Sequence, residues 1–217
     1  MSRVTRIKVG TVLLTLVASG LLVASLTAPL WRMRMEAPQY RDEEALRVNV
    51  YPNSMNGDLR EIKVLNQYVG VTIPEKLPQT VWLPAVLIGG AVLSLIAVSL
   101  PMRFRRKALL TVASLLVVAL LASAGVAQWQ MYKIGHDRNH KAALRGVKDF
   151  TPPLLGKQKI ENFTVSAWLG AGAYLIVAAI ALEIGGAFVA CGESCPHCHP
   201  SVCPHEPHPS AIPHVKA

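Results

Sequence analysis

The hydrophobic residues of this chain are gathered in four long blocks instead of recurring at the period of a surface helix or a half-buried strand. The blocks cover residues 9–31, 80–102, 108–130 and 163–187. A transmembrane helix needs about 20 mostly apolar residues, and each block is long enough to supply one. The pattern therefore predicts an all-α integral membrane protein with four transmembrane helices.

The segments between the blocks are polar and of unequal length. They form an N-terminus, a first outer loop, a short basic loop, a second outer loop and a C-terminal tail, at residues 1–8, 32–79, 103–107, 131–162 and 188–217.

Local patterns predict a small mixed α/β unit in the first outer loop. Residues 46–51 alternate between apolar and polar side chains, as in a half-buried strand, and Asn56-Gly57 is a strong turn signal. Residues 58–61 then have the spacing of a capping box, so a short helix should follow and end at Gly70. In the second outer loop, two prolines make residues 151–156 an extended segment that leads to the fourth block.

Lysine and arginine decide the predicted orientation. The first eight residues carry three of them, and residues 103–107 carry four, so both segments should lie in the cytoplasm. This gives four passes with both termini inside, in a bacterial cytoplasmic membrane, although each outer loop also holds seven basic residues. The first block reads as a retained signal-anchor or as a cleaved signal peptide, and both readings keep the same orientation.

The composition excludes several classes of function. The net charge is +9, with 52% hydrophobic and 16% charged residues. Because the basic residues lie in loops beside a membrane, they fit anionic head groups, and no basic helical stripe predicts a nucleic-acid partner. The sequence also has no nucleophile–base pair, paired acids or phosphate-binding loop, so we assign no catalytic residues.

The C-terminal tail holds all four cysteines and five of the seven histidines. Thiolates and imidazoles at short spacing can wrap Cu(I) or Zn(II) without a prior fold, so we predict a disordered tail that binds copper or zinc. A tail with no specific ligand remains the alternative. The candidate metal ligands in the tail are Cys191, Cys195, Cys198, Cys203, His197, His199, His205 and His208.

Two other chemistries fit the sequence CPHCH within this tail. The spacing matches covalent attachment of haem c through Cys195 and Cys198, with His199 as the axial ligand. This alternative needs the tail on the outer side of the membrane. The CPHC part also suits a redox dithiol, but such a dithiol needs a helix N-terminus in a thioredoxin fold, which the proline-rich surroundings do not favour.

Outside the tail, two pairs of side chains are candidate metal ligands. His136 is four residues before His140, so a helix would place both rings on one face, where they can share a metal; two solvated loop histidines are the alternative. Met33 and Met35 lie beside the first block on one face of an extended segment. Their thioethers suit Cu(I), and plain packing is the alternative.

Glu183 is the one charged residue within the four blocks. An acid at full membrane depth is typical of a functional site. We place Glu183 about one turn from the inner end of the fourth helix instead. There it should reach the interface or pair with Arg103 or Arg105.

Four motifs occur in a distinctive order: residues 37–40 (APQY), 56–70 (NGDLREIKVLNQYVG), 132–136 (YKIGH) and 152–164 (PPLLGKQKIENFT). Together with the apolar blocks between them, they resemble a family of small four-pass membrane proteins encoded beside bacterial nitrous oxide reductase genes, in the atypical group of these gene clusters. The resemblance covers roughly residues 30–165 and does not include the tail.

The resemblance implies an accessory role around an exported copper enzyme, in maturation, copper delivery or electron supply. The partners would then be the lipid bilayer and other membrane or exported assembly proteins. His136 matches the family's glycine–histidine step, but Gln67 and Val71 stand where the family has histidine and methionine. A membrane-anchored mono-haem c electron-transfer protein and a structural subunit of a larger membrane complex remain the alternatives.

Overall fold

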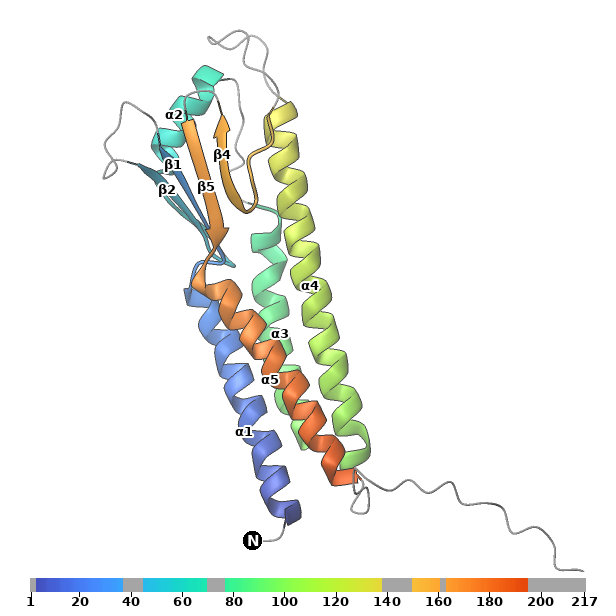
Figure 1. Cartoon of the computed structure of the whole chain (residues 1–217). Helices are drawn as coiled ribbons and strands as arrows, with labels where there is room; N and C mark the ends of the chain where they lie inside the picture. Colours follow the sequence, from blue (N-terminus) through green and yellow to red (C-terminus); the bar gives the residue numbers. More distant parts are fainter. Residues whose placement is uncertain (1–2, 37–44, 70–76, 138–149, 161–162, 195–217) are drawn as a thin grey trace, which may run out of the picture.

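The computed structural model describes residues 3–36, 45–69, 77–137, 150–160 and 163–194. Four long helices form a bundle, and a small sheet lies at one end of it (Figure 1). In chain order the elements are α1 Arg3–Ala24, the 3₁₀ turn η1 Ser25–Thr27, β1 Trp31–Glu36, β2 Leu46–Val50, β3 Met55–Gly57, α2 Leu59–Val69, α3 Gln79–Ser99, α4 Met102–His136, β4 Gly156–Ile160, β5 Phe163–Leu169 and α5 Ala171–Ser194.

The four predicted membrane helices are present. The candidate spans are Val9–Thr27, Gln79–Ser99, Phe104–His136 and Ala171–Ala190, each long and apolar enough to cross a membrane. The helices contact each other in a ring in which α1 lies between α3 and α5, and α4 closes the other side. Because the chain turns back after each span, all neighbouring helices in the ring are antiparallel (Figure 1).

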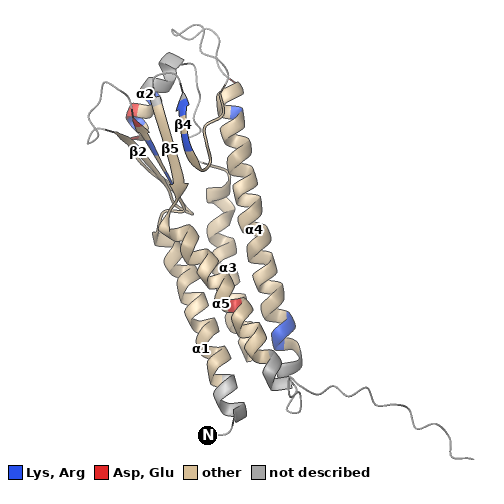
Figure 2. Cartoon of the chain, viewed as in Figure 1, with Lys and Arg blue, Asp and Glu red and all other residues tan. Residues whose placement is uncertain are grey.

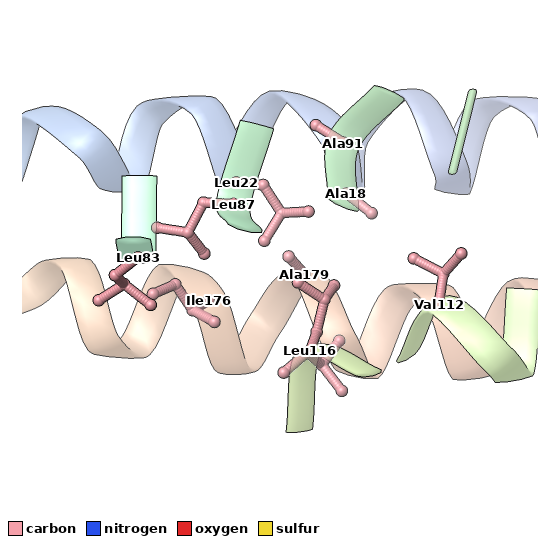
Figure 3. Close-up of a cluster of buried hydrophobic side chains, with 10 residues drawn as sticks. Ala18, Leu22, Leu83, Leu87, Ala91, Val112, Leu116, Ile176 and Ala179 are labelled. Carbon is pink, nitrogen blue, oxygen red and sulfur yellow. The ribbon is translucent and has the colours of Figure 1, made fainter. Parts of the chain in front are cut away.

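Small and medium side chains fill the centre of the bundle. Figure 3 shows Ala18 and Leu22 of α1 close to Leu87 and Ala91 of α3, with Ala179 of α5 beside them. The large apolar side chains lie mostly on the outside of the helices. This arrangement is expected of helices whose surroundings are lipid, because lipid tails solvate apolar side chains as well as a protein core does.

The sheet joins both outer loops. It has five antiparallel strands in the order β3-β2-β1-β5-β4, so the first loop supplies three strands and the second supplies β4. The predicted strand and helix of the first loop are confirmed as β2 and α2. The prediction that the fourth transmembrane helix begins at residue 163 is wrong, because residues 163–169 form β5, which pairs with every residue of β1.

Three further boundaries differ from the prediction. Residues 103–107 belong to α4 instead of forming a loop, so only Leu100 and Pro101 separate α3 from α4. At the chain ends, α1 begins at Arg3 within the predicted N-terminal segment. α5 continues to Ser194, so residues 188–194 are helical and the tail begins later than predicted. The predicted disorder of residues 195–217 lies outside the described residues.

The longer α5 also corrects the position of Glu183. This residue lies near the middle of the helix instead of one turn from its end, and its side chain is fully buried. It is hydrogen-bonded to Ser94 of α3, and no ion pair joins it to Arg105 among the described side chains. The side chain of Arg103 is not described.

The sheet is anchored to the bundle by direct backbone contact. The N–H of Gly170 donates to Leu30 O (2.8 Å), and the N–H of Gly172 donates to Pro29 O (2.9 Å). A Cβ on Gly170 would lie 2.0 Å from Pro29 O, so no larger residue fits where β5 turns into α5. The 35 residues of α4 are about 52 Å long, which carries its upper end alongside the sheet, where Met131 joins the apolar cluster beneath the strands.

Candidate functional site: the basic face of the sheet

The two faces of the sheet differ in chemistry because side chains alternate along each strand. One face is apolar and is covered by α2 and by residues from α4 and the connecting segments. Its buried cluster consists of Trp31, Val48, Val50, Ile62, Leu77 and Ala167, with Met33, Leu46, Met55, Leu59, Met131 and Leu154 packed against it. The other face is polar and contains most of the charge of the described sheet (Figure 2).

The strand register arranges the polar face in rows, because residues directly opposite each other in antiparallel strands share a face. One row crosses four strands as Lys157, Ser166, Arg34 and Arg47. The next row, closer to the bundle, contains Trp168, Arg32, Asn49 and Asn56. A third row, farther from the bundle, contains Lys159, Thr164 and Glu36.

Five cations therefore share this face with one acid. Arg34 and Arg47 are directly opposite each other, a pairing that destabilises a sheet. The single acid, Glu36, pairs with Arg34, its Oε1 lying 2.9 Å from Arg34 Nε. Asp58 does not form an ion pair with the guanidinium of Arg47. Instead, Asp58 Oδ2 accepts a hydrogen bond from the backbone N–H of Arg47 (2.8 Å). The described face thus has a strong excess of positive charge.

A cavity of ≈ 440 Å³ lies in this face at the end nearest the bundle. It is lined by Pro29, Arg32, Met33, Arg34, Arg47, Asn49, Tyr51 and Trp168. Three arginines line this open space, and Trp168, which is 42% exposed, lies beside them. Guanidinium forks bind carboxylate and phosphate oxygens in pairs, so this cavity suits an acidic group.

The predicted tail ligands cannot be placed. Cys195, Cys198, Cys203, His197, His199, His205 and His208 lie outside the described residues, and only the backbone of Cys191 is described, within α5. Copper or zinc binding, haem c attachment and the redox dithiol therefore stay predictions. Within the described ranges, no three His, Cys, Asp or Glu side chains lie close enough together to hold a metal ion.

His136 is the last residue of α4 and lies at the same end of the bundle as the sheet. Its Nδ1 is 2.9 Å from Tyr132 O, and its ring stacks on Tyr132 at 4.0 Å between centroids. Because a carbonyl oxygen can only accept, this contact is a hydrogen bond when Nδ1 carries the proton, and in the neutral form of that ring the lone pair is on Nε2. His136 is thus oriented as a single metal ligand would be, while its predicted companion His140 is outside the described residues.

The two methionines beside the first helix favour packing over copper binding. Met33 packs against the apolar cluster and lies opposite Val48 and Ala167, while Met35 lies opposite Leu46 and Val165.

Sequence reasoning missed the basic face, although a signal was present. In WRMRME, LRVNV and GKQKI, the basic residues stand at every second position or directly between apolar ones. Such alternation indicates one charged face of a strand. The second loop was not predicted to contain a strand, so Lys157 and Lys159 were not aligned with the arginines of the first loop.

Comparison with known proteins adds no relative: no family model matches this chain, and no curated protein matches it. Support for a function therefore comes from the residues of the chain and from the motif resemblance given above.

Proposed function

We propose that this chain is a membrane-anchored accessory protein that docks an exported partner on the basic face of its sheet. By the motif resemblance, the partner is nitrous oxide reductase or one of its assembly proteins, and the role is copper-enzyme maturation or electron supply. The observation that carries the proposal is the alignment of Arg32, Arg34, Arg47, Lys157 and Lys159 on one face of a sheet fixed to the bundle.

Two properties of this face support docking. Like charges held opposite each other lower the stability of a fold, so their presence on one face favours a role in recognition over a role in folding. A concentrated positive surface attracts an acidic partner over distance and selects against basic ones. The backbone anchoring of the sheet at Leu30 and Gly170 keeps the face in one position relative to the membrane.

The proposed orientation places this face outside the bacterial cytoplasmic membrane. Arg105, Arg106 and Lys107 lie at the start of α4, at the end of the bundle away from the sheet (Figure 2). Basic residues in short connections favour the cytoplasmic side, so both chain ends would be inside and the sheet outside. A reporter enzyme fused after Ala217 should then be active only when it is of a type that works in the cytoplasm.

Metal chemistry enters the proposal at both ends of the molecule. Outside, the available Nε2 of His136 provides a single ligand for transient contact with copper. Inside, the cysteines and histidines that follow α5 form a tail that binds copper or zinc. The alternative, haem c at Cys195 and Cys198, needs the opposite orientation, so activity of a periplasmic reporter at Ala217 would favour the mono-haem electron-transfer protein instead.

The docking proposal is tested by reversing charge on matched faces. Arg32→Glu with Arg47→Glu changes two exposed residues of the basic face. Arg60→Glu with Lys63→Glu makes the same charge change on α2, which lies over the opposite face of the sheet. Both double variants, in the full-length protein, should insert normally.

We expect the first pair to weaken co-purification of the exported enzyme at low salt by about tenfold or more, and to lower its copper content, because steering and charge pairing are both lost. The control pair should change neither. Equal losses in the two pairs, or no loss in either, would show that the basic face is not the docking surface.

A further inference from the structure

Glu183 is a buried acid at a depth where the bilayer would surround the helices. It is the twelfth residue after the start of α5 and is 0% exposed. At 1.5 Å per residue, about 18 Å of helix separates it from the sheet end of α5 and about 10 Å from the other end of the apolar span, Ala190. Figure 2 shows the acidic segment of α5 partway along the bundle, with the basic segment of α4 close to its level in that view.

Hydroxyl groups are also buried on two other helices, α3 and α1. Ser94 of α3 is hydrogen-bonded to Glu183 Oε1. On α1, Thr11, Thr15 and Ser19 are all buried and four residues apart, so they form one row on a single face. The row is level with the acid, because a Cβ at Gly186 of α5 would lie 3.8 Å from Thr15 Oγ1.

Ser19 ties the same row to α3. Its Oγ donates to Ala91 O at 3.3 Å, three residues before Ser94. Small residues at this level, Ala18, Ala91 and Ala179, let the three helices approach closely (Figure 3). Ser19 and Thr15 of α1 therefore lie within about one helical turn of the level of Ser94 and Glu183.

The hydrogen bonds of Ser94 indicate which form of the carboxyl fits. Ser94 Oγ lies 2.8 Å from Gly90 O and also bonds to Glu183 Oε1. A hydroxyl has one hydrogen, which Ser94 can donate either to Gly90 O or to Glu183 Oε1. When the hydrogen goes to Gly90, the contact with Glu183 needs a hydrogen from the carboxyl, which makes a chain from Glu183 to Ser94 to Gly90.

Among the described side chains, none forms an ion pair with Glu183. Glu183 Oε2 is buried and has no hydrogen-bond partner. In the described parts of the spans, α1 and α3 present no charged side chain to it, and α5 carries no other. On α4, the basic residues with described side chains in its first turns are Arg105, Arg106 and Lys107, and the guanidinium of Arg105 donates to Leu100 O instead of to Glu183. A buried charge without a partner is costly, whereas a neutral acid can be accommodated.

We propose that Glu183 and Ser94 form an internal proton-binding site and that the hydroxyl row of α1 is its route of exchange. The carboxyl holds the proton and donates it in a hydrogen bond to Ser94. When the proton leaves to water, the carboxylate keeps the negative charge and the Ser94 hydroxyl turns from Gly90 O to the carboxylate. The route runs past Thr15 and Thr11, toward the end of the bundle away from the sheet.

This inference is independent of the docking proposal, and infrared spectroscopy of the full chain in lipid vesicles tests it. At neutral pH the wild type should show the carbonyl stretch of a protonated carboxyl group that shifts in D₂O, and Glu183→Gln should remove it. Ser94→Ala should move the band to higher frequency, because the carboxyl loses its acceptor. Ser114→Ala is the matched control, since Ser114 bonds to Leu110 O at the same 2.8 Å but is exposed on α4.

The exchange route is tested by the rate at which that band shifts in D₂O. Thr15→Val removes a buried hydroxyl and should slow the exchange several-fold. Thr111→Val removes a hydroxyl that is bonded in the same way but exposed on α4, and should leave the rate unchanged. Circular dichroism would verify that each variant keeps its helices.

Each outcome decides the matter. The site is supported if the band is lost in Glu183→Gln and is shifted in Ser94→Ala but not in Ser114→Ala. A carboxylate spectrum at every pH from mildly acidic to alkaline overturns it, and a spectrum that changes only with added sodium or potassium would assign the site to a cation instead. If Thr15→Val exchanges as fast as the wild type, the route along α1 is wrong.

Discussion

The bundle and the sheet are built in opposite senses. In the bundle, many large apolar side chains such as Leu13 point outward, and the interior combines leucines, isoleucines and alanines with buried hydroxyls and a carboxyl group. In the sheet, apolar side chains point inward against α2, and the exposed face contains cations. The difference follows from the surroundings: burial from water stabilises the sheet by about 25 cal/mol per Å² of apolar surface, whereas lipid gives no comparable gain.

This comparison shows where to look for function in each region. Polar groups inside the bundle and a charge excess on the sheet are both arrangements that stability alone would not select. Glu183 in the bundle and the arginines on the sheet are therefore the candidates for function. Four substitutions would distinguish a bundle packed in lipid from a sheet stabilised by burial from water.

The largest effect is expected where the regions meet. Gly170→Val places side-chain atoms where a Cβ alone would already lie 2.0 Å from Pro29 O, and the backbone cannot move without breaking the bond to Leu30. We expect a loss of about 4 kcal/mol or more in the anchoring of the sheet. Limited proteolysis in membranes should then cut the outer loops while the helices stay protected. Gly89→Ala, with open space around the new Cβ, should be neutral.

Next in size is a cavity in the bundle. Leu22, near the C-terminal end of α1, is fully buried in the core cluster of the bundle, and Leu13 on the same helix is 60% exposed. Leu22→Ala should lower the free energy of unfolding in mixed micelles by about 2–4 kcal/mol, because the lost contacts are not replaced. Leu13→Ala should cost well under that amount if lipid covers the outer surface. Equal costs would mean that the bundle is packed like a protein in water.

A smaller effect is expected from one hydrogen bond that joins the two outer loops. Trp31 Nε1 donates to Leu154 O at 2.6 Å, and Trp31→Phe keeps most of the ring while removing the donor. We expect a loss of about 1–2 kcal/mol in sheet stability, since the carbonyl is left without a partner. Hydrogen exchange of β1 and β5 would measure it. Trp129→Phe, at an exposed ring on α4, is the control and should leave the exchange unchanged.

The smallest change tests the charge excess directly. Arg47→Gln removes one of two cations held opposite each other, so the sheet should become more stable by about 0.3–0.5 kcal/mol at low salt. In about 1 M salt, where the screening length is about 3 Å, most of this gain should vanish. A destabilised variant would instead indicate that Arg47 contributes to folding.

The helices could be predicted from sequence because membrane depth sets the length of an apolar block. The sheet was harder, since FTVSAWL is apolar enough to merge with the following helix, although Val165 and Ala167 alternate with Thr164, Ser166 and Trp168. What makes it a strand is its pairing with β1, and that partner is distant in the chain.

The two candidate sites were missed for related reasons. The basic face exists only once the strand register brings the two loops together. Glu183 was placed near an interface because composition put the end of the helix at residue 187, whereas hydrogen bonding carries α5 on to Ser194. In both cases the deciding contact joins residues that no local pattern connects.

The pairing of β1 with β5 also fixes an order of assembly during synthesis. β1 leaves the ribosome early and can pair at once with β2, but its other edge waits until α3, α4 and the second loop have been made. At about 5–20 residues per second this wait is on the order of ten seconds, and an unpaired strand edge is a template for wrong partners. A chain that stalls before β5 should keep that edge open, which exposes it to the chaperones and proteases of the compartment and marks it for removal.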